Sequence, residues 1–419
     1  MSTLPIYEDE TFVQMLRSKF EGLDNGDLFF NNAAGAMRLR SVLILQSQLA
    51  QVPDYPSADG GIRARQLYQA MERGKEMLRL LIQAPDSGEI IQDLSASRLL
   101  FSLAEAAVRC TAGRKVITTE LDHPASIDGV KRAAQRYGSE VIVVPVDQNS
   151  HSISVHSIMD VISDDVGVLM MTCTSNTTGA HLPYVEISNL VRRKCPNAFI
   201  ILDGVQRVPH GSVNLDQCSA DALVMAPYKV FGARGSGLAW VSDRINQISH
   251  ECLFGQTSSS WTLGSVDPVS FGLMDAIGAY FSMVGGIVDP IASLEKRIVL
   301  GQEYVEIRER YLHALMLDGT EDVRGLRHIP GIQVWFDNDN LAAKDFIVSI
   351  SVQSASSRDF YKKLLDQGII VSLRQEGSIY CGTLLKSYGS GDVLRISPMH
   401  YNTKEEILHF LHTIQSLLQ

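Results

Sequence analysis

The fold is decided by the stretch Ile200-Ile-Leu-Asp-Gly-Val-Gln-Arg-Val-Pro-His210, in which an apolar run ends at Asp203. Such a run predicts a buried strand, and Asp203 then stands where the strand ends. An ionised carboxylate in this position is costly to bury unless a cation lies beside it. The alternative is an aspartate that only caps the following turn, which is common at such positions.

A second stretch contains a lysine in a similar position after an apolar run. It reads Asp221-Ala-Leu-Val-Met-Ala-Pro-Tyr-Lys-Val-Phe-Gly-Ala-Arg-Gly-Ser-Gly237. Lys229 follows another apolar run and stands among glycines. An isolated lysine is usually solvated, but a partly desolvated one has a lowered pKa and a reactive amine. Asp203 and Lys229 after successive buried runs suggest pyridoxal 5′-phosphate (PLP), whose ring nitrogen needs a carboxylate and whose aldehyde forms an imine with lysine.

Apolar runs bounded by turn residues continue on both sides of these stretches and predict a sheet of buried strands. Helix-like spacing occurs between them at Ser126–Tyr137 and Val185–Arg193. This alternation predicts an α/β fold around a mainly parallel sheet, which binds ligands at the carboxyl ends of its strands. The predicted strands are 116–119, 141–146, 166–172, 198–203, 222–226 and 237–241.

The C-terminal part of the chain predicts a second, smaller α+β domain. A long, charged, largely helical segment over 286–319 connects it to the first. We therefore expect a large domain over 25–288 and a small domain made of 1–24 and 289–419, with the amphipathic Thr11–Phe20 packed on the small domain. Its expected strands are 332–336, 346–351, 368–373 and 393–397. Its expected helices are 357–366 and 403–418.

The composition is that of an ordinary globular protein, with 45% apolar and 20% charged residues and a net charge of −10. Because basic residues do not cluster, we expect no nucleic-acid partner. The N-terminus lacks the features of a signal peptide, and no run reaches the length of a membrane span, so we expect no membrane partner. Six scattered cysteines without a CxxC pair indicate no metal site and a reducing, cytoplasmic location.

Six motifs in order resemble the class V (cysteine desulfurase-like) branch of fold-type I PLP enzymes. The resemblance covers nearly the whole chain and implies the two-domain fold of that group, with a large domain around a mainly parallel seven-stranded sheet and a small C-terminal α+β domain. The motifs are Asn31-Asn-Ala-Ala-Gly35, Glu120-Leu-Asp-His-Pro-Ala125, Ser175-Asn-Thr-Thr-Gly179, Asp203-Gly-Val-Gln206, Tyr228-Lys-Val-Phe-Gly232 and Arg395-Ile-Ser397.

The resemblance implies the roles of the catalytic residues. Lys229 resembles the lysine that carries the cofactor, and Asp203 the partner of the pyridine nitrogen. His123 resembles the residue stacked on the cofactor ring, for which a flat imidazole is suited. Asn176 and Gln206 resemble the amides beside the phenolic oxygen, and Thr174 or Ser175 could assist them.

The phosphate is expected at the N-terminus of the helix that follows Leu94-Ser-Ala-Ser97, where backbone N–H groups are free. Ser95 is the expected N-cap, and Ala96 and Ser97 complete the loop. Tyr228, where the family has histidine, can still donate a hydrogen bond, whereas Ala226 lacks the hydroxyl usual in the family. Gly264-Ser265 resembles the pair through which a second subunit completes the phosphate site, and this implies a homodimer.

The amino-acid substrate needs a partner for its carboxylate. Arg395 is the first candidate, because a guanidinium binds a carboxylate through two hydrogen bonds; the alternative is a surface ion pair. Arg374 is a second candidate. The resemblance adds Asn176 and Ala34 to the substrate-binding residues.

Cys381 is a candidate nucleophile, because cysteine desulfurases attack the substrate sulfur with a cysteine in this region. Counted from Gly377, however, Tyr380 occupies the position of that cysteine and Cys381 falls one residue later. A buried or incidental thiol is the alternative. The resemblance favours a C–S (β-elimination) lyase; a class V aminotransferase, an epimerase or another enzyme acting at Cα are alternatives, as is a scaffold without catalysis.

Overall fold

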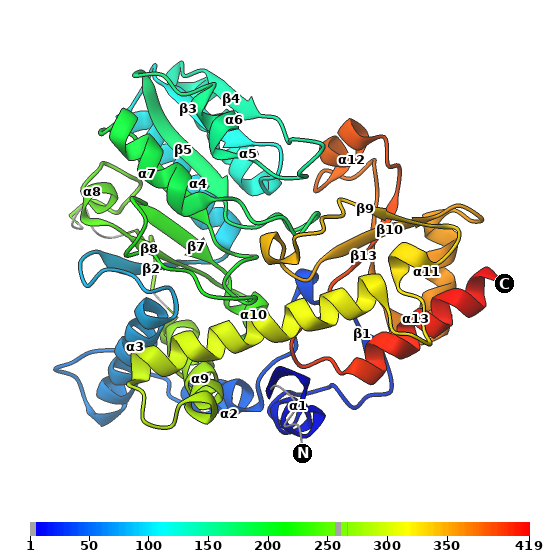
Figure 1. Cartoon of the computed structure of the whole chain (residues 1–419). Coiled ribbons are helices and arrows are strands. Elements are labelled where there is room, and N and C mark those ends of the chain that lie inside the picture. Colours follow the sequence, from blue (N-terminus) through cyan, green and yellow to red (C-terminus); the bar gives the residue numbers. More distant parts are fainter. Residues whose placement is uncertain (1–5, 256–260, 266) are drawn as a thin grey trace.

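The chain forms two α/β parts that are connected by one long helix, α10 (Leu294–Asp318), as Figure 1 shows. The computed structural model describes residues 6–255, 261–265 and 267–419. The first five residues of the N-terminal segment that we assign to the small domain lie outside this range.

The large part is built on a seven-stranded sheet in which, of the described strands, β8 alone runs in the direction opposite to the others. Parallel strands bring their carboxyl ends to one edge of the sheet. In sheet order the strands are β2 (Glu89–Asp93), β8 (Gly237–Val241), β7 (Ala222–Met225), β6 (Phe199–Asp203), β5 (Val166–Thr172), β3 (Lys115–Thr119) and β4 (Val141–Val144).

Both faces of this sheet are covered by helices, so the central strands are buried on both sides. One face packs against α4 (Ala96–Cys110) and α5 (Pro124–Tyr137). The opposite face packs against α3 (Ile62–Leu81), α7 (Tyr184–Lys194) and α9 (Pro268–Val288). This layered α/β architecture confirms the predicted fold class. The remaining helices of this part are α2 (Arg40–Ala50), α6 (Val155–Met159) and α8 (Asp243–Asn246).

The small part has a four-stranded antiparallel sheet and a separate pair of short strands. The four strands, in order, are β12 (Ser372–Arg374), β13 (Val393–Ile396), β10 (Val348–Val352) and β9 (Ile332–Trp335), and the pair is β1 (Leu28–Phe29) with β11 (Ile369–Ile370). The segment 368–373, predicted as one strand, therefore contributes to two sheets. The helices are α11 (Ser357–Asp366), α12 (Gly382–Tyr388) and α13 (Lys404–Leu418).

The stretch from α1 (Glu10–Arg17) to Phe30 contacts both parts and crosses the predicted boundary at 24/25. In α1, Phe12 and Leu16 belong to the large hydrophobic cluster. Leu28 and Phe30, further along the chain, belong to the core of the small part. The predicted boundaries at 24/25 and 288/289 stay a prediction.

Helix α9 corrects one expectation from the sequence. Its 21 residues are long and apolar enough to cross a membrane by length and composition, although we expected no run of that kind. More than half of the helix is buried, however, and it packs against α2, α3 and α10. Burial by other helices explains the composition, since a core helix is apolar for the same reason as a membrane helix.

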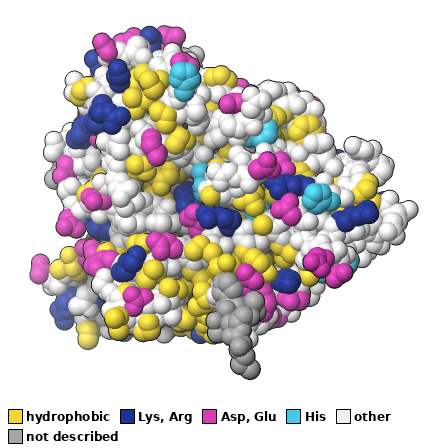
Figure 2. Space-filling model, viewed as in Figure 1, with side chains coloured by type: hydrophobic (Ala, Val, Ile, Leu, Met, Phe, Trp, Pro, Cys, Tyr) yellow, Lys and Arg dark blue, Asp and Glu magenta, His cyan; other side chains and the backbone are white. Residues whose placement is uncertain are grey.

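Charged side chains of both signs are intermingled on the face of the molecule in Figure 2. This mixture agrees with the moderate net charge of −10. Such a surface creates no extended field of one sign on that face.

Candidate active site

Lys229 closes a short 3-10 helix, η3 (Pro227–Lys229), that follows β7. The side chain is only 7% exposed, and its amine donates a hydrogen bond to the carbonyl oxygen of Ala33. Burial lowers the pKa of Lys229 from 10.5 to about 7; the Arg395 guanidinium acts in the same direction, and Asp203 opposes it. The amine is therefore a nucleophile at neutral pH.

The turn after Lys229 is anchored in the core by Phe231. This residue has a positive φ of 66°, which costs a non-glycine residue free energy. Its fully buried ring contacts Phe20, Tyr280 and Phe281. Aromatic packing offsets the backbone cost and fixes the turn that presents Lys229.

Asp203 ends β6, beside Thr172 at the end of β5. Its carboxylate is 4% exposed and accepts a hydrogen bond from the backbone N–H of Val205 at 3.0 Å. Burial raises the pKa of Asp203 to about 6, although the nearby Lys229 charge opposes the change. A second cation beside this carboxylate would keep it ionised.

His123 is the N-cap of α5, and its Nδ1 accepts a hydrogen bond from the N–H of Ala125 at 3.1 Å. Burial lowers the pKa of His123 to about 4, and the charges of Lys229 and Arg374 contribute. The imidazole is therefore neutral at physiological pH, with its proton on Nε2. The ring of Tyr380 lies 5.8 Å from it between centroids.

Lys229, Asp203 and His123 line one cavity. Of the other residues predicted for the cofactor, Ala96, Ser97, Asn176, Gln206 and Tyr228 also line it. The sequence did not indicate the remaining lining residues, which are Leu100, Leu121, Thr172 and Val205; Thr174 was suggested as an assisting residue. The carboxyl ends of β5, β6 and β7 thus place the predicted side chains together.

The N-terminus of α4 forms one end of this cavity. Ser95 is its N-cap and accepts a hydrogen bond from the N–H of Arg98 at 3.1 Å, and it is not among the residues that line this cavity. Ala96 and Ser97 in the first turn face the cavity. Gly237 at the start of β8 makes this approach possible, because a Cβ there would lie 2.2 Å from the Ala96 nitrogen.

Arg395 lies on β13 and is 1% exposed. Its guanidinium donates to the Asn176 carbonyl at 2.8 Å and to Asn31 Oδ1 at 3.3 Å. Burial lowers the pKa of Arg395, as does the charge of Arg374, but the group stays a cation at neutral pH. Among the described residues, Arg395 Nε and Arg374 Nε and Nη2 are buried without a hydrogen-bond acceptor.

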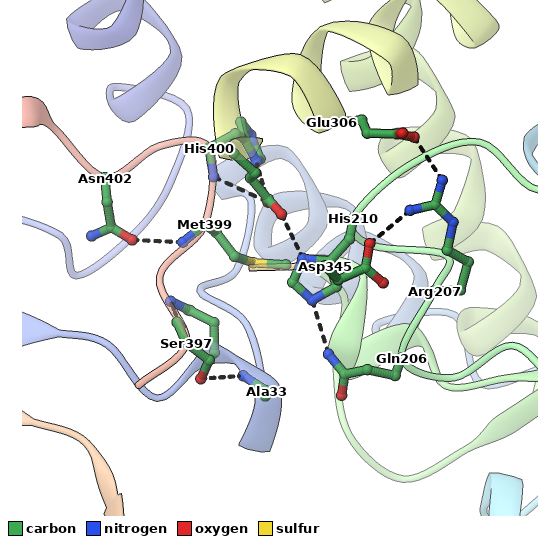
Figure 3. Close-up of polar contacts among 12 residues, drawn as sticks. Ala33, Gln206, Arg207, His210, Glu306, Asp345, Ser397, Met399, His400 and Asn402 are labelled. Atoms are coloured by element: carbon green, nitrogen blue, oxygen red, sulfur yellow. Dashed lines mark hydrogen bonds and ion pairs between the residues drawn. The ribbon is translucent and has the colours of Figure 1, made fainter. Parts of the chain in front are cut away.

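The Asn31–Gly35 loop contacts both Arg395 and Lys229. The N–H of Ala33 donates to Ser397 Oγ at 3.0 Å, two residues after Arg395 (Figure 3). The predicted substrate residue Ala34 is exposed, and its carbonyl accepts a hydrogen bond from Arg234 at 3.1 Å. Ala33, not Ala34, is therefore the residue of this loop that contacts Lys229.

Ser265 does not line the cavity of Lys229 in the same chain. It is exposed and lines a different cavity of about 850 Å³ together with Gly264 and Asp93.

Cys381 packs in a small apolar cluster with Phe336, Leu385 and Val393. Its sulfur lies 3.6 Å from the carbonyl oxygen of Gln375. The neighbouring Tyr380 is 52% exposed and is the residue of this pair that contacts His123.

Sequence reasoning missed Asp122, which precedes His123. Its buried carboxylate accepts hydrogen bonds from Thr118 Oγ1 at 2.6 Å and Thr119 N at 2.8 Å, and also from Thr172 N. Burial raises the pKa of Asp122 to about 7. These bonds tie the ends of β3 and β5 together under His123. In the sequence, the only signal for Asp122 was its position directly before His123, the predicted stacking residue.

Among the residues that the structure describes, no three His, Cys, Asp or Glu side chains gather closely enough to hold a metal ion. The ionisable groups around Lys229 are instead arranged for acid–base chemistry, with an amine, a carboxylate and an imidazole whose pKa values are all shifted.

Known proteins of similar sequence cover most of the chain. A probable cysteine desulfurase of Pseudomonas putida is 23% identical over 355 residues, which are 84% of this chain and 83% of the relative. A cysteine desulfurase of Pectobacterium carotovorum is 23% identical over 407 residues, which are 93% and 92% of the two chains.

Solved structures share the fold. An apo cysteine desulfurase of Thermococcus onnurineus superposes with a TM-score of 0.82 at 18% identity, covering 96% of this chain and 97% of that one. The cysteine desulfurase CsdA of Escherichia coli gives a TM-score of 0.78 at 20% identity, with 97% and 98% covered. The model of the aminotransferase class-V family matches residues 28–267 and 291–410. This chain belongs to the aminotransferase class-V family.

Proposed function

We propose that this protein is an enzyme that holds PLP covalently through Lys229 and acts as a C–S lyase on an amino acid. The observation that carries the proposal is the shared cavity of Lys229 and Asp203, in which the amine has a pKa of about 7. Cysteine desulfurases named among its relatives support the choice of a sulfur-containing substrate.

The residues of the cavity fit PLP. Asp203 has a pKa raised by burial, and a cationic ring nitrogen beside it would reverse that change. Gln206 Oε1 and Thr174 Oγ1 are buried without partners in the described part of the chain and suit polar groups of a ligand. The first-turn N–H groups at Ala96 and Ser97 suit its phosphate. When bound, PLP supplies an electron sink for the negative charge that develops at Cα.

The chain itself supplies the proton transfer and the binding. Once the amino group of the substrate has displaced it from the cofactor, the amine of Lys229 would take the proton from Cα, which a group with a pKa near the working pH does efficiently. The neutral ring of His123, oriented by the N–H of Ala125, offers a flat uncharged surface to the cavity. The unpaired Nε groups of Arg395 and Arg374 suit the substrate carboxylate.

The fate of the sulfur distinguishes two lyase reactions. A desulfurase transfers sulfur to a cysteine thiolate and leaves alanine. A simple β-elimination breaks the Cα–H and Cβ–S bonds of cysteine and releases sulfide, and hydrolysis of the remaining fragment yields pyruvate and ammonia. The packing of Cys381 against Phe336 and Leu385 favours β-elimination, because that thiol faces an apolar cluster.

An enzyme that acts at Cα without breaking a C–S bond, such as an aminotransferase or epimerase, is the second candidate. The observation that favours it is Tyr380, which contacts His123 where a desulfurase has its nucleophile. Both candidates need Lys229 and Asp203, so they differ only in their products.

The deciding experiment reconstitutes the purified protein with PLP and mixes it with a panel of amino acids in a stopped-flow spectrometer. We expect a visible absorbance band that borohydride removes, a spectral change with cysteine or its S-substituted derivatives, and release of sulfide with pyruvate. Lys229→Ala is the matched control and should lack the band. If wild type shows no band, the cofactor proposal fails; if it shows a band but no sulfide, the second candidate replaces the first.

We further propose that two copies of the chain form the active unit in the cytoplasm. The support is that Ser265 does not line the Lys229 cavity of its own chain, together with the resemblance that pairs Gly264-Ser265 with the phosphate site of a neighbouring subunit. Sedimentation of the purified protein should give the mass of a dimer, and a Ser265→Ala variant should bind PLP more weakly. A monomer with unchanged PLP affinity in that variant would contradict the proposal.

A further inference from the structure

In the described part of the chain, the side-chain nitrogen of Gln206 has a hydrogen-bond partner and its side-chain oxygen has none. Gln206 is 3% exposed and lines the cavity of Lys229 and Asp203. Its Nε2 lies 2.8 Å from Nε2 of His210, four residues further along the chain. Its Oε1 is buried and has no partner among the described residues. Gln206 therefore contacts His210 and also lines the cavity of Lys229 and Asp203.

On its other side His210 contacts Glu309 of α10, and Figure 3 shows His210 with its hydrogen bond to Gln206. Its Nδ1 lies 2.6 Å from Oε2 of Glu309, and both side chains are buried, at 0% and 4% exposure. The carboxylate accepts hydrogen bonds only, so Nδ1 of His210 carries a proton. The other oxygen of Glu309 accepts a hydrogen bond from the N–H of His400 at 3.2 Å, which fixes the carboxylate.

With Nδ1 protonated, only Nε2 of His210 can change its role. In the neutral imidazole, Nε2 accepts a hydrogen bond from Nε2 of Gln206, and the carbonyl oxygen of Gln206 is left for the cavity. In the imidazolium, Nε2 becomes a donor and needs the carbonyl oxygen, so the NH₂ group of Gln206 is left for the cavity. A half-turn of the amide exchanges the two arrangements, because its oxygen and nitrogen occupy nearly the same space.

The charged groups around His210 come from several elements. Burial lowers the pKa of His210 and Glu309 raises it; Asp345 raises it as well, Arg207 lowers it, and the resulting pKa lies above the ordinary value. His400 contacts the same carboxylate, and burial lowers its pKa, so it stays neutral. The imidazolium form of His210 is therefore accessible near neutral pH.

We propose that His210 is a positioning residue, whose protonation, set by Glu309, decides whether Gln206 offers a hydrogen-bond donor or an acceptor to the cavity. The inference rests on the proposed function only in that PLP is the ligand of the cavity. PLP presents an anionic phenolic oxygen, which a donor stabilises and a carbonyl oxygen repels. Protonated His210 thus supports the cofactor, and neutral His210 disfavours it.

The first test needs no cofactor. In the apo-protein with ¹⁵N-labelled histidine and glutamine, the imidazole signals of His210 should titrate at Nε2 while Nδ1 stays protonated. The side-chain amide signals of Gln206 should follow the same midpoint. Glu309→Gln should lower this midpoint by about one pH unit or more, as expected from loss of a neighbouring opposite charge. Glu306→Gln is the matched control: it removes a charge one turn away that pairs with Arg207 and Arg310, not with His210.

The second test uses the PLP-loaded protein and follows its visible absorbance against pH. Glu309→Gln and His210→Phe should both shift the spectral midpoint, and His210→Phe should cause no further shift in a Gln206→Leu background. An unchanged Nε2 midpoint in Glu309→Gln, or a shift by His210→Phe that persists without Gln206, would overturn the proposal. Absence of any PLP band would overturn the proposed function, while the titration of the apo-protein would still decide the coupling of His210 to Gln206.

Discussion

The amine of Lys229 donates its hydrogen bond to the carbonyl oxygen of Ala33, a residue 196 positions earlier in the chain. Ala33 is in turn held by Ser397, at the end of the strand that carries Arg395. Lys229, the N-terminal loop and strand β13 are thereby linked through one residue, Ala33, whose N–H and carbonyl groups both take part. A change at any of these three segments should affect the other two.

The lowered pKa of Lys229 predicts how pH controls the attachment of the cofactor. Only the neutral amine reacts with an aldehyde, and with a pKa of about 7 half of it is neutral at pH 7. The rate at which PLP attaches to the apo-protein should therefore fall about tenfold for each pH unit below 7 and level off above it. Stopped-flow absorbance at several pH values measures this, and a rate that keeps rising toward pH 10 would contradict it.

Asp203→Asn should keep the fold and bound PLP but reduce kcat by roughly 100-fold or more, because a neutral amide cannot stabilise a protonated ring nitrogen. Steady-state kinetics at saturating substrate and thermal unfolding measure the two effects separately. Near-normal kcat would mean that the carboxylate serves only to accept the Val205 hydrogen bond.

Arg395→Lys should raise KM for an amino acid about tenfold and change kcat less, because a point charge attracts a carboxylate but loses the paired hydrogen bonds. The control is a substrate without a carboxylate, such as cysteamine, for which the variant and wild type should differ little. If both substrates lose affinity equally, the main role of Arg395 is to hold Asn176 and Asn31.

Cys381→Ser should retain at least roughly half of the activity, because a thiol in an apolar cluster behaves as a small hydrophobic side chain. Tyr380→Ala, which removes the ring beside His123, should reduce activity more. Sulfide, alanine and pyruvate are measured for each variant, and mass spectrometry searches for a persulfide. Complete loss of activity in Cys381→Ser, with a persulfide on Cys381 in wild type, would make the protein a true cysteine desulfurase.

Gly237→Ala should weaken PLP binding and lower the free energy of unfolding by about 1–3 kcal/mol, since the new methyl group overpacks the first turn of α4. Gly377→Ala is the control, because no described atom lies within 4 Å of its added Cβ. Denaturant unfolding and a PLP titration check both variants. Equal stability of the two would show that α4 can shift away from β8 without cost.

The central strands were predictable because they are buried on both faces. The run 166–172 matches β5 in full, because every residue of this strand is buried and its side chains do not alternate between apolar and polar. Strand β2 was missed because Glu89-Ile-Ile-Gln-Asp93 has only two successive apolar residues and lies at the edge of the sheet. The run 368–373 was predicted as one strand, but its two halves pair with different partners, β1 and β13.

In the site, the predictable residues follow strands, because parallel strands bring their carboxyl ends together without further information. Lys229 and Asp203 are of this kind, whereas Asn176 was expected only from the family resemblance. The partners of His210 were not predictable, since Glu309 lies 99 residues away on a helix whose packing no local pattern specifies. Asp122 was missed for a similar reason: its bond to Thr172 exists only because β3 and β5 are neighbours in the sheet.

Helix α10 has a thermodynamic consequence for the whole chain. Its first half contributes Ile298, Tyr304 and Val305 to the large hydrophobic cluster, and its second half contributes Leu312 and Met316 to the small one. One helix is thus part of both cores, so neither core can melt while the other keeps all of its contacts. Heating should accordingly unfold the two parts in one cooperative transition, although they are separate sheets, and truncation between them should leave neither half stable.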